Sequence, residues 1–271
     1  MRQRCIANDM IDTNSTDHAA RAGVALVTGA GRRIGRAIAL GMAQAGWDVA
    51  VHYRHSEAEA QEVVAAIRAL GRRAVALHAD LAIESAVRAL PGQVIHLLGG
   101  LDCIVNNASL FEYDKPDDFS AALLATHMQC NVAAPLLLAQ SLHALVPDGG
   151  QAVVVNLLDQ KLYNLNPDFL SYTLSKAALH TATTLLGQAL APKLRVVGVA
   201  PGITMVSGEQ TGDGFERAHT MTPLGRSSTP QDIVEAVCYA ARARALTGTT
   251  LLVDGGQHLL PLQRDVMFLT E

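Results

Sequence analysis

Short apolar runs alternate along the chain with longer stretches in which apolar residues recur every three or four positions. The runs are residues 24–28, 48–53, 73–80, 101–108, 151–158, 194–202 and 249–256. Runs of this length, rich in Val, Ile and Leu, are typical of buried strands. Because parallel neighbours need a crossover connection, this alternation predicts an α/β protein. The expected fold is a single-domain doubly wound Rossmann fold, with a seven-stranded parallel sheet and helices on both faces, including helices from Arg33 to about Ala45 and from Glu57 to Leu70.

Three segments fall outside the alternation. Residues 1–21 are polar and lack the apolar core of a signal peptide, which favours a disordered tail or an upstream start codon. Residues 203–228 are rich in Gly and Thr and have no clear period, which is typical of a substrate loop, although plain flexibility is an alternative. The apolar C-terminal segment 257–271 suggests that residues 259–269 dock on another subunit; packing on its own subunit is the alternative. Residues 22–271 otherwise form one expected domain, because nothing within them marks a second composition regime.

Composition excludes several classes of function. A net charge of −4 and a pI near 6.2 give no basic surface for nucleic acid. The 4 cysteines and 10 histidines have no metal-ligand spacing, so we expect reduced thiols, a cytoplasmic location and no metal. Residues 119–147 contain no Asp, Glu, Lys or Arg, but polar residues and Pro135 interrupt them, which favours a buried or subunit-facing helix over a membrane span.

The first predicted strand runs into a glycine-rich turn that opens a helix, Thr28-Gly29-Ala30-Gly31-Arg32-Arg33-Ile34-Gly35. Glycines let the backbone approach a pyrophosphate, and the helix N-terminus offers unpaired N–H groups to the anion. The strand and helix around this turn therefore predict a nucleotide site that includes Gly29, Arg32, Arg33, Ile34 and Gly35.

The end of the second strand indicates which nucleotide is bound. An NAD site usually has an acidic residue there, but this chain reads His52-Tyr53-Arg54-His55-Ser56. Arg54 and Ser56, with Arg32 and Arg33, form a cationic pocket suited to a 2′-phosphate. NADP(H) is therefore the predicted cofactor; the alternative is that these are solvated residues at a strand end.

Several short segments together resemble the short-chain dehydrogenase/reductase family, in the family's order and over residues 22–258. They are Thr28 to Gly35, Asp80, Asn106-Asn107-Ala108-Ser109, Asn131, Tyr172-x-x-x-Lys176, Pro201-Gly202 and Asp254-Gly255-Gly256. The resemblance implies cofactor contacts at Asp80, Leu81, Asn107, Ala108, Ser109, Tyr172, Lys176, Pro201, Gly202 and Ile203. It also implies a homotetramer.

Two departures from the usual family pattern are similar to its pteridine reductase branch. Arg33 stands where the family usually has glycine, and Asp159 replaces the serine at the end of the fifth strand. His52-Tyr53 and Phe111 also resemble that branch. The resemblance then implies a flat pterin substrate beside Phe111, with Arg33 and Ser109 at its edges.

The chemistry of the Tyr172–Lys176 pair can be argued from the residues. A phenol with a pKa near 10 is a poor acid at pH 7, so a nearby ammonium is needed to bring that pKa down. Lys176 lies one helical turn beyond Tyr172, which is the required placement. The resemblance adds that Lys176 holds the nicotinamide ribose and that Asn131 positions a water leading protons to it.

The identity of residue 159, an aspartate, indicates which kind of bond is reduced. Serine would donate a hydrogen bond to a carbonyl oxygen, whereas an aspartate accepts from amino groups or, with a raised pKa, passes on a proton. Reducing a C=N bond needs a hydride on carbon and a proton on nitrogen, which suits Asp159 and Tyr172. The alternatives are an aspartate that merely caps a loop and a Phe111 that belongs to the core.

The predicted function is therefore NADPH-dependent reduction of a dihydropteridine of the dihydromonapterin, dihydrobiopterin or dihydrofolate type. One alternative is a reductase of a carbonyl, such as a 3-oxoacyl thioester. Another is a non-catalytic NADP(H) sensor.

Overall fold

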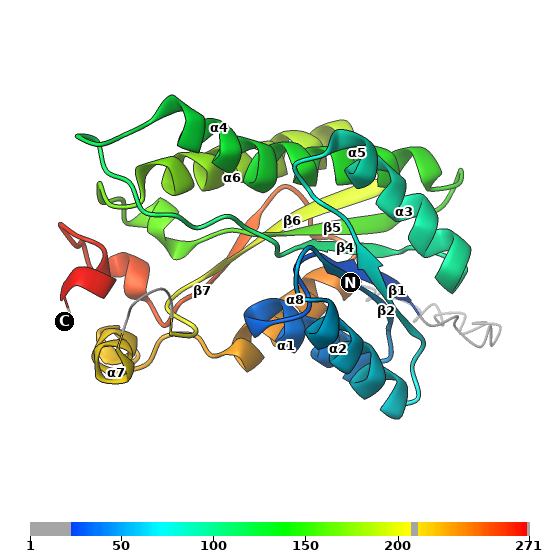
Figure 1. Ribbon diagram of the computed structural model, residues 1–271, viewed down its shortest axis with the longest axis horizontal. Coiled ribbons are helices and arrows are strands. Elements are labelled where there is room, and N and C mark those ends of the chain that lie inside the picture. Colours follow the sequence, from blue (N-terminus) through cyan, green and yellow to red (C-terminus); the bar gives the residue numbers. More distant parts are fainter. Residues whose placement is uncertain (1–22, 207–210, 270–271) are drawn as a thin grey trace, which may run out of the picture.

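The computed structural model describes residues 23–206 and 211–269, so the predicted tail 1–21 lies outside the described residues. The strands form one parallel sheet in the order β3-β2-β1-β4-β5-β6-β7 (Figure 1). Each strand lies inside a predicted run: β1 (Val24–Val27), β2 (Asp48–Tyr53), β3 (Ala74–His78), β4 (Cys103–Asn106), β5 (Ala152–Leu157), β6 (Leu194–Pro201) and β7 (Thr250–Val253). The predicted fold is confirmed.

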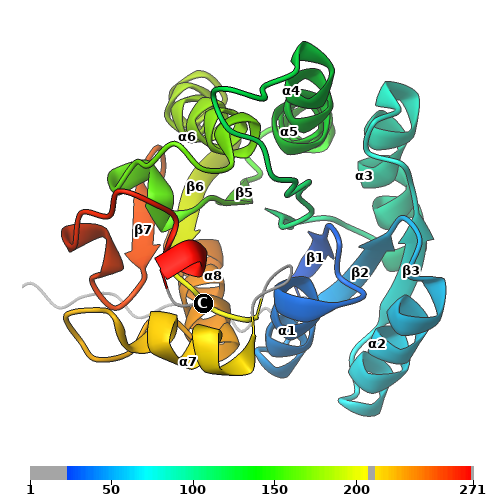
Figure 2. The same ribbon diagram turned by 60° about the vertical axis from the view of Figure 1, so that its left-hand side comes forward.

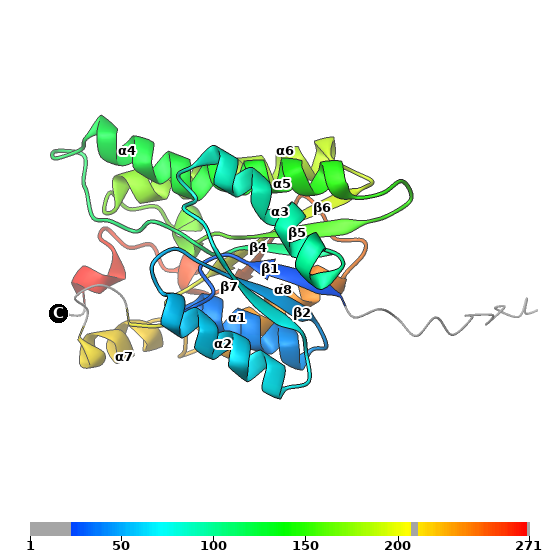
Figure 3. The same ribbon diagram turned by 45° about the vertical axis from the view of Figure 1, so that its right-hand side comes forward.

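Helices cover both faces of the sheet (Figures 1 and 3). One face carries α1 (Arg33–Gln44), α2 (Glu57–Ala69) and α8 (Pro230–Arg242). The other carries α3 (Glu84–Leu98), α5 (Ala134–Leu145) and α6 (Leu170–Ala189). Every residue of β1, β2, β4 and β5 is buried. The continuous apolar runs follow from this burial, since both faces of the strands are covered.

The charge-free stretch 119–147 forms a helical column of α4 (Ala121–Met128), the π-helical turn η1 (Gln129–Ala133) and α5. By length and composition alone, 121–145 could cross a membrane. One side of this helical column belongs to the core, where Leu138 and Leu142 are fully buried. Only 33% of the most apolar 18 residues of the column is buried within this chain. The column therefore has a core face and an outer face that this subunit leaves uncovered.

A buried amide pair joins the two central strands of the second half. Asn106 of β4 lies in register with Asn156 of β5, and Asn106 Nδ2 donates to Asn156 Oδ1 at 2.8 Å. Asn156 Nδ2 donates in turn to the Thr183 hydroxyl of α6 at 2.9 Å. Both asparagines are buried, so the pair fixes β4, β5 and α6 relative to one another.

The segment predicted as one long loop, 203–228, contains a helix, α7 (Gly212–Thr220). The side chain of Thr211 accepts a hydrogen bond from Gly214 N at 3.0 Å and caps its first turn. Gly212 and Gly214 weaken the helical period in the sequence, which is why the expectation of an irregular loop was wrong. Residues 207–210 lie outside the described part of the chain.

Beyond β7 the chain forms η3 (Gln257–Leu259) and η4 (Val266–Leu269). η4 lies beside α7 (Figure 2), and η3 lies beside the 3₁₀ helix η2 (Gln160–Tyr163). The hypothesis that 259–269 dock on another subunit stays a prediction, whereas contacts of the segment within its own subunit are present. Lys161 forms an ion pair with Asp265, and Asp168 forms one with Arg264. The buried charges of Lys161 and Asp168 need such partners. The segment packs on its own subunit.

Candidate active site

A cavity of about 730 Å³ opens at the carboxyl edge of the sheet, between the turn after β1 and the C-terminal segment. Among the predicted site residues, only Asn131 does not line it. Those that do are Gly29, Arg32, Arg33, Ile34, Gly35, His52, Tyr53, Arg54, His55, Ser56, Asp80, Leu81, Asn107, Ala108, Ser109, Phe111, Asp159, Tyr172, Lys176, Pro201, Gly202 and Ile203. The structure thus brings the predicted cofactor and substrate residues into one site.

The glycine-rich turn leaves no room for a side chain at Gly29 or Gly35. Gly29 has φ +62°, and a Cβ on Gly35 would overlap the carbonyl oxygen of Gly29 and the amide of Asn107. Arg33, where the family usually has glycine, has φ +53°, the left-handed region that favours glycine. A bulky residue kept there at a cost in backbone strain suggests a function for its side chain.

His52 supports this turn from within the protein. Its Nδ1 accepts from Gly29 N at 3.1 Å, and its Nε2 faces Ala79 O at 3.1 Å. Burial lowers the pKa of His52 to about 4, so the ring is neutral and can accept at Nδ1 while donating at Nε2. Both ring nitrogens are thus bonded within the fold, so the predicted contact of His52 with the cofactor would not be a hydrogen bond from either nitrogen.

Cations stand at the cavity edge beside β2, but two of them have acidic partners. Arg54 Nε lies 3.3 Å from Asp80 Oδ2, and Arg32 pairs with Glu59, a residue that the sequence argument did not consider. Asp80 also accepts from Ala82 N at 2.9 Å, so the turn-capping alternative is realised beside any contact to adenine. Because the Arg32 and Arg54 side chains are more than half exposed, both remain available to an anion.

The centre of the site is a hydrogen bond between Tyr172 and Asp159. Tyr172 Oη donates to Asp159 Oδ2 at 2.8 Å, from α6 to the end of β5. Asp159 Oδ1 accepts from Lys161 N at 2.8 Å and caps the 3₁₀ helix η2 (Gln160–Tyr163). Capping, raised as the alternative for Asp159, therefore coexists with a contact to Tyr172.

Burial sets the proton affinities of this centre. It raises the pKa of Asp159, and burial together with the Asp159 charge raises the pKa of Tyr172 well above 10. Burial lowers the pKa of Lys176 to about 8. Both shifts favour the protonated forms of Asp159 and Tyr172.

The expected lowering of the Tyr172 pKa by Lys176 is not seen. Lys176 Nζ donates to Leu157 O at 2.8 Å and lies 5.6 Å from the centroid of the Tyr172 ring. Asp159, not the ammonium, is the nearest charge to the phenol oxygen, so the proton stays on the pair.

Asn131 lies behind the cavity in η1 and is 1% exposed. Its Nδ2 donates to Leu110 O and to Ser175 Oγ, both at 3.0 Å, and its Oδ1 accepts from Leu110 N at 2.8 Å. It therefore holds the segment that carries Ser109, while the predicted water relay remains a proposal.

Phe111 belongs to an aromatic cluster that the sequence reveals only in part. Its ring stacks on Phe169 with centroids 4.3 Å apart and meets the edge of Tyr172 at 4.7 Å. Tyr113 packs edge-on against Phe169 at 5.0 Å. Phe111 is 41% exposed, so it is not an ordinary core residue. No sequence period marks Phe169 or Tyr113.

Backbone contacts hold the two loops that flank the nicotinamide end of the expected cofactor site. The N–H groups of Asn107 and Ala108 both donate to Thr28 Oγ1 at 3.0 Å. Ile203 N donates at 3.1 Å to the side chain of Gln257, which sequence reasoning missed. Among the described residues no cluster of three His, Cys, Asp or Glu could hold a metal.

The chain is similar to known proteins over most of its length. The model of a family described as enoyl-(acyl carrier protein) reductase matches residues 29–258. A crystal structure of FolM alternative dihydrofolate reductase 1 from Brucella canis, complexed with NADP, is 40% identical, with a TM-score of 0.85 over 90% of this chain and 96% of that one.

Two curated relatives act on other substrates. L-rhamnose 1-dehydrogenase (NAD(P)(+)) from Sphingomonas sp. strain SKA58 is 32% identical over 86% of this chain and 95% of its own length. A 3-oxoacyl-[acyl-carrier-protein] reductase from Staphylococcus aureus is 32% identical over 87% and 98%.

Fold and site together define an oxidoreductase with a nucleotide-binding parallel sheet. The chain belongs to the short-chain dehydrogenase/reductase family.

Proposed function

We propose that this protein is an NADPH-dependent reductase of dihydropteridines of the dihydromonapterin, dihydrobiopterin or dihydrofolate type. The observation that carries the proposal is the hydrogen bond from Tyr172 to Asp159 beside the exposed ring of Phe111. Asp159 stands where an ordinary carbonyl reductase of this family has serine. The Brucella canis relative, described as an alternative dihydrofolate reductase, supports the same class of substrate.

The residues present fit NADP(H). Gly29 and Gly35 let the turn at the N-terminus of α1 pack closely against its own backbone and against Asn107 and Ala108, where any side chain would collide. Arg54 and Ser56 line the same cavity at the end of β2, with no acidic residue between β2 and α2 to bind a free ribose diol. Similar solved structures hold NADP in complex. When bound, this cofactor would supply the hydride.

The protein's own part of the reaction is the proton. Tyr172 can donate its hydroxyl proton to a ring nitrogen. Asp159, whose pKa is raised by burial, can in its protonated form return a proton to the phenolate across their 2.8 Å contact and then take a proton from solvent. The balance is one hydride to carbon and one proton to nitrogen, so a C=N bond becomes CH–NH.

The carboxylate also discriminates among substrates. Asp159 can accept from the amino group and ring N–H of a pterin, whereas a ketone offers it no donor. Phe111 offers a flat face to a bicyclic ring, worth about 0.5–1.5 kcal/mol beyond burial. Both features favour a pterin over an aliphatic ketone.

NADPH oxidation by the purified protein tests the proposal, with dihydrobiopterin and dihydromonapterin as substrates and an acetoacetyl thioester as the comparison. We expect turnover of a pterin, reduced about 100-fold or more in Tyr172→Phe and Asp159→Ala. Asp148→Ala is the matched control, because Asp148 is fully exposed and does not line the cavity.

The second candidate function is reduction of a 3-oxoacyl thioester, favoured by the Staphylococcus aureus relative. Thioester turnover without pterin turnover, retained or raised in Asp159→Ser, would establish that function and refute the first.

A further inference from the structure

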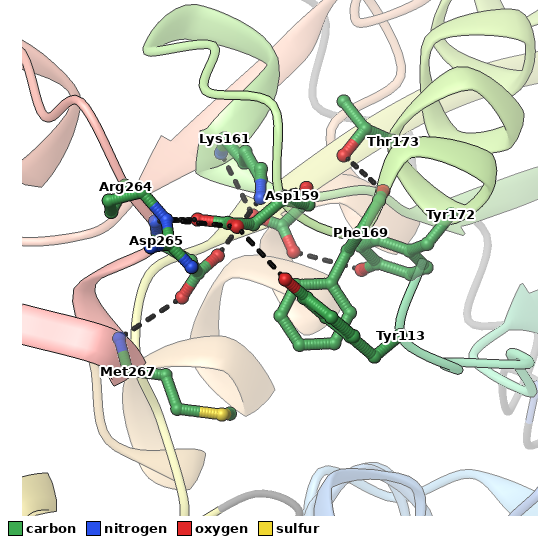
Figure 4. A network of polar contacts seen from close by, with 10 residues as sticks. Tyr113, Asp159, Lys161, Phe169, Tyr172, Thr173, Arg264, Asp265 and Met267 are labelled. Carbon is green, nitrogen blue, oxygen red and sulfur yellow. Dashed lines mark hydrogen bonds and ion pairs between the residues drawn. The ribbon is translucent and has the colours of Figure 1, made fainter. Parts of the chain in front are cut away.

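The last part of the described chain forms one wall of the cavity. Residues 260–269, here called the C-terminal strap, run across its mouth, and Leu262, Asp265, Val266 and Met267 line it. Figure 4 shows the side chains of Arg264 and Asp265 facing the segment between β5 and α6, which carries Asp159. Nothing in the proposed reaction so far uses these residues.

Asp168 anchors the strap. Its carboxylate, 2% exposed, accepts from Arg264 Nε at 3.0 and 2.8 Å and from Asp265 N at 2.7 Å. Although burial opposes ionisation, these hydrogen bonds hold the pKa of Asp168 below its usual range. The anchor therefore exists as a charged, fully bonded group.

Aromatic rings reinforce the anchor. Phe268 stacks on Phe169 with centroids 6.1 Å apart, and the Arg264 guanidinium lies 4.8 Å from the Phe268 centroid. Phe169 has φ +55°, an uncommon conformation for a bulky residue, and it begins the helix that carries Tyr172. The strap thus packs on the side chain of the residue that precedes α6, the helix that carries Tyr172.

A second ion pair lies closer to the chemistry. Lys161 Nζ donates to Asp168 O at 2.6 Å and to Asp265 Oδ2 at 3.0 Å. Its side chain is 4% exposed and that of Asp265 20%. The other Asp265 oxygen accepts from Met267 N at 3.1 Å, so the carboxylate has one fixed orientation.

The Lys161–Asp265 ion pair acts on Asp159 in two ways, through a backbone hydrogen bond and through its charges. The N–H of Lys161 donates to Asp159 Oδ1, which leaves Oδ2 for Tyr172. Four groups face the Asp159 carboxyl: Tyr172 and Lys176 from α6, Lys161 from η2, and Asp265 from the strap. Beyond burial, the Asp265 charge raises the pKa of Asp159 and that of Tyr172, whereas the Lys161 charge lowers that of Asp159.

We propose that Lys161 and Asp265 are positioning residues for proton transfer: through this ion pair, the C-terminal strap sets the affinity with which Asp159 and Tyr172 hold their shared proton. The inference rests on the proposed function, in which the pair supplies that proton. The two charges act on Asp159 with opposite sign.

The test is the pH profile of kcat/KM in variants that each remove one charge. Activity needs the proton on the pair, so it is lost as pH rises through the pair's apparent pKa. Asp265→Asn removes a negative charge and keeps the shape, so the basic limb moves to lower pH, by about one unit. Lys161→Met removes the positive charge, so the limb moves to higher pH.

The double variant Lys161→Met/Asp265→Asn has no net charge change, so we expect its limb to return toward wild type. Lys193→Met and Asp148→Asn are matched controls, because that ion pair is on the surface and does not line the cavity. Their profiles should equal the wild-type profile. If Lys161→Met does not fold, Lys161→Gln replaces it with the same expected sign.

Shifts of the same sign in both variants, or a loss of kcat with no shift of the limb, would overturn the proposal and leave the pair a purely structural role. The outcome is independent of the substrate. If the wild type reduces only the thioester, the proposed function fails, and the same profiles are measured with the thioester, because Tyr172 protonates either product.

Discussion

Replacing Arg33 by glycine separates backbone strain from side-chain function in the turn after β1. Arg33 has φ +53°, and the left-handed conformation costs a non-glycine residue about 1–2 kcal/mol. Glycine removes that cost but loses about 0.5–1 kcal/mol through the greater freedom of its unfolded chain. The variant also loses the side-chain interactions of Arg33. We therefore expect Arg33→Gly to unfold within about 1 kcal/mol of wild type.

Arg36→Gly is the matched control. Arg36 is exposed and lies one turn further along α1 in ordinary helical conformation, so its replacement costs about 1 kcal/mol. Stability would be measured by urea denaturation at one protein concentration, followed by the fluorescence of Trp47, the single tryptophan. Arg33→Gly should be the more stable variant and yet bind NADPH about 10-fold more weakly, because a charge-assisted contact to phosphate is lost. Equal destabilisation of the two variants would refute the strain, and unchanged NADPH affinity would refute the cofactor contact.

Three further changes test other parts of the structure. Gly35→Ala should abolish NADPH binding in a titration, since its Cβ overlaps the Gly29 backbone, whereas Gly92→Ala, in open space within α3, should raise the urea midpoint. The pKa of His52 is about 4 in the folded protein and 6.5 in the unfolded chain, so the unfolded state binds more protons below pH 6.5. Lowering the pH from about 7.5 to about 5 should therefore reduce the free energy of unfolding of the wild type. The reduction should be about 2 kcal/mol larger than in His52→Gln, which lacks the titrating ring. The proposed homotetramer should dissociate in Leu185→Glu, because this α6 side chain is 59% exposed; an unchanged mass in light scattering would contradict that interface.

The sheet and the core of the site could be predicted from the sequence because their signals are local. Strands covered on both faces are continuous apolar runs, so each observed strand fell inside a predicted run. Asp159 and Tyr172 are 13 residues apart, on a strand end and the following helix, and they meet at 2.8 Å. A local turn likewise revealed the glycines that line the cavity.

The remaining features depend on contacts that no local pattern encodes. Lys161 and Asp265 are 104 positions apart, and nothing near either residue indicates the other. The stacking of Phe111 on Phe169 depends on how the chain enters α6, with Phe169 in a left-handed conformation that its sequence does not favour. The reversal of the expected pKa shift at Tyr172 arises from burial, which the sequence leaves open.

The amide pair of Asn106 and Asn156 specifies the register of β4 against β5. The neighbouring positions of β4 and β5 are almost all aliphatic, and such strands would pack nearly as well after sliding two residues past each other. A slide would strip each buried amide of its partner at about 1–3 kcal/mol apiece and carry Asp159 about 7 Å away from the loop that starts at Asn107. Asn106 and Asn156 do not line the cavity, yet they make a shifted register less stable and so keep Asp159 in its place in the site.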